Sequence, residues 1–185
     1  MNRMPLVDPA QAQGRSRELL AEIQAAFGAT PNMFRAVAHS SAALQAMWSA
    51  FGALGRGSLP PALGERIAVA VAERNACHYC LAAHTALGRK AGVSEAELHR
   101  AQHGRSDDPR IEAALRFALQ LVEQRGSVDD AAVQAVRQAG YSDEAIVEIL
   151  AHVALNLFTN YVNVAFAVPV DFPRVALRHE AAAAA

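Results

Sequence analysis

The chain has 185 residues, enough for one domain that buries a substantial core. Hydrophobic residues make up 52% of the sequence, many of them alanine, and aromatic residues 6%, a composition that favours helices over a β-sandwich. The formal net charge is -1 and no long basic run occurs, which argues against nucleic acid and membrane partners. Because no apolar secretory leader or long uninterrupted apolar stretch is present, we expect a cytoplasmic protein.

Helical periodicity runs through the chain, and no segment alternates like a strand. Turn and capping residues divide it into segments expected to be helical. In chain order these segments are 10–27, a short helix after Pro31, about 41–54, 62–74, a helix that contains both cysteines and ends near Gly92, 94–102, 109–125, 129–139 and 142–166. Residues 103–108 are expected to form the most polar and most mobile loop. The sequence therefore predicts an all-α fold.

We expect one domain over residues 1–185. Its core is predicted at about 40–175, preceded by a helical extension at 1–39. An extended C-terminal tail is predicted at 168–185, because Pro169 and Pro173 interrupt that segment. The final run of alanines is given no role.

The two cysteines stand close together in Cys77-His78-Tyr79-Cys80. A secreted scaffold would use more cysteines, spaced to join distant segments, whereas a close pair in a reducing compartment indicates redox chemistry or half of a metal site. On one helix, Cys77, Cys80 and His84 share a face. A thiolate that attacks a peroxide becomes a sulfenic acid, which a neighbouring thiol condenses to a disulfide. His84 is placed to take the proton of Cys80 or to stabilise its thiolate.

A zinc site is the main alternative for the cysteine pair. His78 and His84 supply further ligand types, but one short helical stripe does not easily surround a tetrahedral ion. The remaining histidines are scattered over different segments without paired spacing, and they are His39, His99, His103, His152 and His179. His152 alone is expected to line the cysteine pocket, from a neighbouring helix. Neither a metal nor a cofactor is predicted.

Each site residue also has a purely structural interpretation. His84 could be a buried core histidine, and His78 points away from the cysteine stripe and could lie on the surface. Glu65 could be a first-turn carboxylate favoured by the helix dipole. Glu73, four residues before Cys77, is the rival relay carboxylate, or else an exposed partner for arginines.

The segment 65–84 resembles alkylhydroperoxidase D, within the carboxymuconolactone decarboxylase-like superfamily. Its pattern of Glu, eleven residues and Cys-x-Tyr-Cys-x-x-x-His is matched at Glu65, Cys77, Tyr79, Cys80 and His84. His78 also falls on the pattern, and residues 160–173 look like the peroxidase-related branch of the superfamily.

The resemblance implies a multi-helix AhpD-like bundle with the Cys-x-x-Cys at the start of a helix. It implies that Cys80 reacts with the peroxide, that Cys77 donates a proton and closes the disulfide, and that His84 and Glu65 form a proton relay, with His78 a further site residue. No cofactor is used in such proteins. An external dithiol, a lipoyl group or a thioredoxin-like protein, reduces the disulfide, and the chains form homotrimers or homohexamers.

The function expected is a thiol-dependent peroxidase for hydrogen peroxide or alkyl hydroperoxides. The alternatives are a thiol–disulfide oxidoreductase that never meets peroxide, and a redox-sensing protein without turnover.

The geometry of the helices decides whether Glu65 or Glu73 is the carboxylate of the proton relay. If one straight helix carried the whole motif, Glu65 would lie about 18 Å from Cys77, and Glu73 would be the relay carboxylate. If the helix breaks near Asn75 and this residue caps a second helix, Cys77 lies in its first turn, where the helix dipole lowers the thiol pKa. The second helix then folds back and brings His84 to Glu65. We favour the broken helix.

Overall fold

The computed structural model describes residues 2–178, so the alanine-rich end and His179 lie outside the described residues. The described part of the chain is helical throughout and contains no strand. Its helices are α1 (Gly14–Phe27), α2 (Asn32–Val37), α3 (Ser41–Leu54), α4 (Pro61–Arg74), α5 (His78–Lys90), α6 (Glu95–Gln102), α7 (Pro109–Glu123), α8 (Asp130–Gln138) and α9 (Asp143–Phe166). The all-α prediction is confirmed, and the helix limits differ from the expected ones by a few residues.

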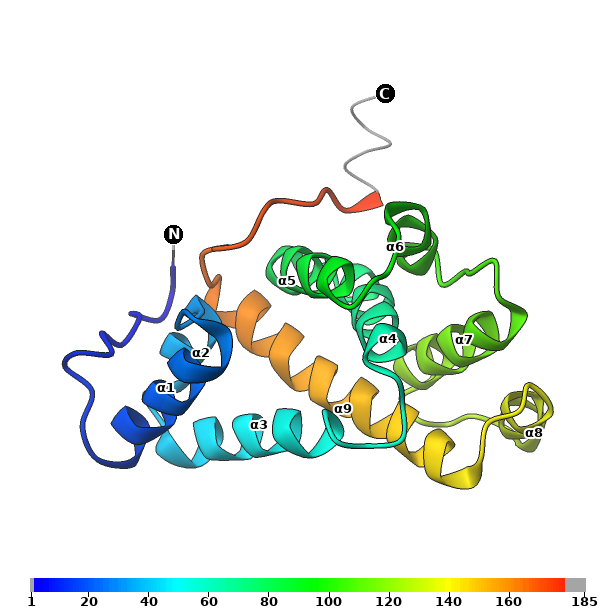
Figure 1. Ribbon diagram of the computed structural model, residues 1–185, viewed down its shortest axis with the longest axis horizontal. Coiled ribbons are helices and arrows are strands. Elements are labelled where there is room, and N and C mark those ends of the chain that lie inside the picture. The colour runs from blue at the N-terminus through cyan, green and yellow to red at the C-terminus, as the bar shows by residue number, and fades with distance from the viewer. Residues whose placement is uncertain (1, 179–185) are drawn as a thin grey trace.

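Helix α9 is the central element of the bundle (Figure 1). It packs against α2, α3, α4, α5, α7 and α8, while α4 also contacts α5, α6 and α7. The core where these helices meet includes Ile67 and Ile149, whose side chains are fully buried. Leu19 and Ile23 of α1 are fully buried in the same core, so the N-terminal helices belong to the fold. Each such side chain contributes about 1.5–3 kcal/mol by leaving water.

By length and composition alone, α9 is also apolar enough to cross a membrane, with 44% of its most apolar window buried inside the fold. A central core helix passes the same test. One face of α9 nevertheless remains exposed and apolar. That face carries Val147, Leu150, Phe158, Tyr161 and Val164, with exposed fractions from 38% to 67%. We refer to these five residues as the outer face of α9.

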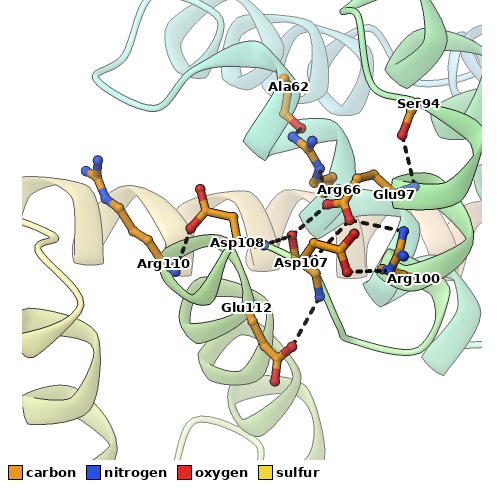
Figure 2. Close-up of polar contacts among 10 residues, drawn as sticks. Ala62, Arg66, Ser94, Glu97, Arg100, Asp107, Asp108, Arg110 and Glu112 are labelled. Carbon is orange, nitrogen blue, oxygen red and sulfur yellow. Dashed lines mark hydrogen bonds and ion pairs between the residues drawn. The ribbon is translucent and has the colours of Figure 1, made fainter.

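The connection between α6 and α7 is fixed by polar contacts (Figure 2). The Glu97 carboxylate accepts hydrogen bonds from Ser106 Oγ at 2.6 Å and from Asp107 N at 3.1 Å. Arg100 pairs with Asp107 at 2.9 Å, and Ser106 is buried. The loop at 103–108, predicted to be polar and mobile, is thus anchored by contacts of its polar residues with neighbouring side chains and backbone.

Candidate active site

The break between α4 and α5 creates the site. The backbone N–H of Cys77 donates to Ala72 O at 2.9 Å, and that of Ala76 donates to Glu73 O at 3.1 Å. Ala76 between them has a φ of 50°. These two bonds and the left-handed residue form a Schellman motif, which ends a helix and satisfies its last carbonyl groups. The expected break is present, and α5 therefore starts in a new direction.

Asn75 does not cap the second helix, contrary to prediction. The Schellman turn follows Arg74, so Asn75 is the C-cap residue of α4 and not the N-cap of α5. Its side chain reaches α9 instead, where Nδ2 donates to Asn160 Oδ1 at 2.9 Å. Residues 75–77 separate the two helices, and the last of them, Cys77, is the N-cap of α5.

Both cysteines lie at the start of α5, as predicted. Cys77 Sγ accepts a hydrogen bond from the backbone N–H of Cys80 at 3.2 Å, the bond that a capping side chain makes. The two thiols are free, and their residues expose 1% and 2% of their surface. The dithiol is thus held at a helix N-terminus and shielded from bulk water.

Glu65 is the carboxylate that reaches His84. Its Oε2 lies 2.8 Å from His84 Nδ1, because α5 packs back against α4. Glu73 is engaged elsewhere: its carboxylate accepts from Gln102 Nε2 at 2.9 Å and from the backbone N–H of Arg178 at 2.9 Å. The expected geometry, with Glu65 and not Glu73 at His84, is present.

The surroundings of Cys80 favour its thiolate. Burial alone would raise the pKa of Cys80, but the Cys77 thiol, the charge of His84, and the side chains of Asn163 and Asn160 outweigh burial and lower the pKa to about 7. The Asn163 Nδ2 lies 3.2 Å from the Cys80 sulfur. Asn160 Nδ2 makes no conventional hydrogen bond, so we regard its contribution as electrostatic.

The protonated forms of His84 and Cys77 are favoured beside this thiolate. Burial disfavours a charged His84, but the carboxylate of Glu65 and the neighbouring Cys80 sulfur outweigh burial and raise the His84 pKa. The hydrogen bond to Cys80 and burial both raise the pKa of Cys77. The prediction that the helix end lowers the Cys77 pKa is therefore wrong, since it is Cys80 that carries the stabilised charge.

Two residues that contact or face Cys80, Asn160 and Asn163, were absent from the predicted site. Both are buried on α9, whose buried residues are mostly apolar apart from these two, Asn156 and Thr159. Buried amides on such a helix need polar partners, and this was the signal that the sequence offered.

His78 and Tyr79 point in different directions from the dithiol. His78 is exposed, whereas Tyr79 is buried. The Tyr79 hydroxyl accepts the backbone N–H of Met33 at 3.2 Å, and its ring meets Phe172 edge-on at 5.7 Å. Tyr79 thus fixes the start of α5 against α2 and the C-terminal segment.

His152 does not line a cavity at the cysteines, and that prediction is wrong. Its ring lies over Gly64 of α4, where an added Cβ would come within 3.1 Å of the ring. Burial lowers the pKa of His152. The charges of Glu148 and Glu65 act against burial, and the charge of His84 acts with it. The ring therefore lies behind the Glu65–His84 pair and away from the sulfur atoms.

Two cavities adjoin the dithiol. A small one of about 40 Å³ contacts Cys80 and His84, and its other walls are largely apolar: Phe27, Pro31, Met33, Phe34, Phe51, Tyr79, Ala83, Leu87, Thr159 and Phe172. A larger one of about 660 Å³ contacts Cys77 and His78. Between residues 2 and 178, no group of three His, Cys, Asp or Glu side chains is arranged to hold a metal ion.

This helical bundle, with a dithiol at the start of a helix, is an AhpD-like fold, and solved structures share it. The alkylhydroperoxidase AhpD core of an uncharacterized peroxidase-related protein from Ralstonia eutropha JMP134 is 27% identical, with 92% of each chain covered and a TM-score of 0.83. A peroxidase-related protein from Silicibacter sp. TM1040 is 25% identical, with 95% of this chain and 92% of that chain covered and a TM-score of 0.78.

The debrominase Bmp8 has the same fold, at 20% identity, with 90% of each chain covered and a TM-score of 0.76. No curated protein matches the chain in sequence. Residues 39–124 match the model of the carboxymuconolactone decarboxylase family. The fold is one that peroxidase-related proteins and a debrominase share.

Proposed function

We propose that the protein is a thiol-dependent peroxidase that reduces hydrogen peroxide or alkyl hydroperoxides through Cys80 and Cys77. The observation that carries this proposal is the thiolate of Cys80, stabilised to a pKa of about 7 between a protonated thiol, a histidine and an amide. Only the thiolate attacks an electrophilic oxygen, so a group with this pKa is reactive at neutral pH.

The proposed cycle is balanced in protons and electrons. The Cys80 thiolate attacks one peroxide oxygen, the O–O bond breaks, and His84 protonates the departing alkoxide or hydroxide. Cys77 then attacks the Cys80 sulfenic acid, water leaves, and a disulfide forms. Glu65 holds His84 in place. An external dithiol finally reduces the disulfide with two electrons and two protons, of which one stays on Cys77 and the other passes through Cys80 to His84, and no cofactor enters the cycle.

The size of the cavity at Cys80 supports a peroxide as the oxidant. A space of about 40 Å³ holds about one or two water-sized groups, enough for a hydroperoxide group. A brominated pyrrole, such as the one bound by Bmp8 in a further structure, is several times larger. The apolar walls favour an alkyl hydroperoxide whose hydrocarbon part lies toward Phe27, which is 42% exposed.

The test uses reduced protein and a stoichiometric amount of hydrogen peroxide, tert-butyl hydroperoxide or cumene hydroperoxide. Thiol titration and mass spectrometry should show a Cys77–Cys80 disulfide. Cys80→Ser should consume no peroxide, whereas Cys77→Ser should accumulate a sulfenic acid on Cys80, because its resolving thiol is missing. Turnover by the Cys80 variant would reverse the two roles. A dithiol that ignores every peroxide but exchanges with disulfides would identify a thiol–disulfide oxidoreductase instead.

A further inference from the structure

The dithiol lies between two separate cavities. The small cavity contacts Cys80 but not Cys77, and the larger one contacts Cys77 but not Cys80. Tyr79 lines both, and its buried ring is fixed by Met33 and Phe172, so it forms the wall between them. Two reagents can therefore reach the two sulfur atoms from different sides.

The larger cavity lies between the start of α5, the end of α9 and the C-terminal segment, residues 167–176. This segment passes from the end of α9 along α5 toward α6 (Figure 1). Glu73 and Gln102 hold the end of this segment: Glu73 accepts the backbone N–H of Arg178, and Gln102 Nε2 donates to Ala176 O at 3.2 Å. A volume of about 660 Å³ is that of an ordinary small-molecule site.

A guanidinium on the wall of this cavity points to an anion. The ionisable side chains on the wall are those of Cys77, His78, Tyr79 and Arg174, and no carboxylate lines it within residues 2–178. Arg174 makes no ion pair with an acidic side chain in the described part of the chain. An unpaired guanidinium beside a reactive sulfur is suited to a thiol ligand that carries a carboxylate.

We propose that the cavity at Cys77 binds the reductant, a small dithiol that carries a carboxylate, with Arg174 as the partner of that carboxylate. The proposal rests on the dithiol cycle proposed above. One ligand thiolate attacks Cys77 Sγ, the Cys77–Cys80 bond breaks, and Cys80 leaves as a thiolate. The second ligand thiol then attacks its own mixed disulfide and releases Cys77, which takes up a proton. The ligand is oxidised to a cyclic disulfide by two electrons.

Attack on Cys77 follows from access and from the leaving group. Cys77 exposes only 1% of its surface, yet it is the cysteine on the wall of the larger cavity, between the exposed residues Ala76 and His78. In thiol–disulfide exchange, the sulfur whose thiol has the lower pKa leaves faster. Cys80 is that sulfur, so exchange through Cys77 is favoured on both counts.

The test compares dihydrolipoate with dihydrolipoamide, which share one dithiol and differ in a carboxylate against a neutral amide. The protein disulfide is prepared with diamide, so the measurement does not depend on peroxidase activity. Stopped-flow reduction should favour dihydrolipoate by about fivefold at low salt, the effect of one partly exposed ion pair, and salt should weaken the preference. Arg174→Gln should abolish the preference through the dihydrolipoate rate alone, and Arg174→Lys should keep part of it.

Arg178→Gln is the matched control, because Arg178 belongs to the same segment but does not line the cavity. An equal effect of this control, or no preference for the carboxylate in the wild type, would overturn the assignment of Arg174. A monothiol anion, 2-mercaptoethanesulfonate, should stop at a mixed disulfide on Cys77, located by peptide mass after an alkylating quench. A mixed disulfide on Cys80 would overturn the assignment of the cavity. Peroxide-driven oxidation, measured separately, tests the proposed function.

Discussion

Replacing Glu65 by Gln tests whether charge, and not only position, makes the thiolate. The amide is nearly isosteric and can still accept the hydrogen bond of His84 Nδ1, but it carries no charge. Burial would then decide the pKa of His84 and favour the neutral ring, because the opposing carboxylate is gone. Cys80 would lose a positive neighbour, and its pKa should rise from about 7.

The expected loss follows from the thiolate fraction. At pH 7, a thiol with a pKa of about 7 is about one half ionised. A rise of one unit leaves about one tenth as thiolate and a rise of two units about one hundredth, so oxidation by peroxide should slow about 5- to 50-fold. Near pH 9.5 the loss should shrink to within about fivefold, because most of the variant thiol is then ionised.

The assay is the ultraviolet absorbance of the thiolate during a pH titration, together with peroxide oxidation rates over the same range. Glu73→Gln is the matched control, since it removes a carboxylate from the same helix away from His84. Its titration should match that of the wild type, with oxidation within about twofold. An unchanged Cys80 titration in Glu65→Gln, or a larger effect of Glu73→Gln, would refute the electrostatic account.

Other changes test separate parts of the structure. Asn163→Leu removes the amide at the Cys80 sulfur and should slow oxidation at pH 7 about tenfold, the range for one hydrogen bond to a charged group; an unchanged rate would mean that the amide does not act on the thiolate. Ala76→Gly should raise the free energy of unfolding in urea by about 0.5–1 kcal/mol, because relief of left-handed strain exceeds the added chain entropy. A lower midpoint would contradict this. The outer face of α9 should pack in a trimer or hexamer, so light scattering should report an oligomer that Tyr161→Asp weakens, and a wild-type monomer would refute it.

The helices could be predicted because their ends are marked locally. Ser40, Ser94 and Ser142 each cap the helix that follows, through a side-chain oxygen that accepts the N–H three residues on. The position of Glu65 beside His84 was also predicted, from the resemblance to alkylhydroperoxidase D, since a contact between residues nineteen positions apart requires a break and a return of the chain.

The remaining features depend on partners far away in the chain. Asn75 is a good capping residue in isolation, but Ala76 adopted the left-handed turn that glycine usually takes, and this moved the cap to Cys77. Asn163 lies 83 positions from Cys80, and only the packing of α9 against α5 joins them. The loop at 103–108 is polar for the same kind of reason, because Glu97 is its partner.

The low pKa of the Cys80 thiol belongs to the folded chain alone. The groups that ionise Cys80 come from α4, α5 and α9, and they meet only after these helices have packed. A nascent or unfolded chain has two ordinary thiols with a pKa of about 8.5, mostly protonated at neutral pH and slow to oxidise. The low thiol pKa is thus acquired on folding, and with it the proposed reactivity toward peroxides, so that the cysteines of an incomplete chain would be spared premature oxidation.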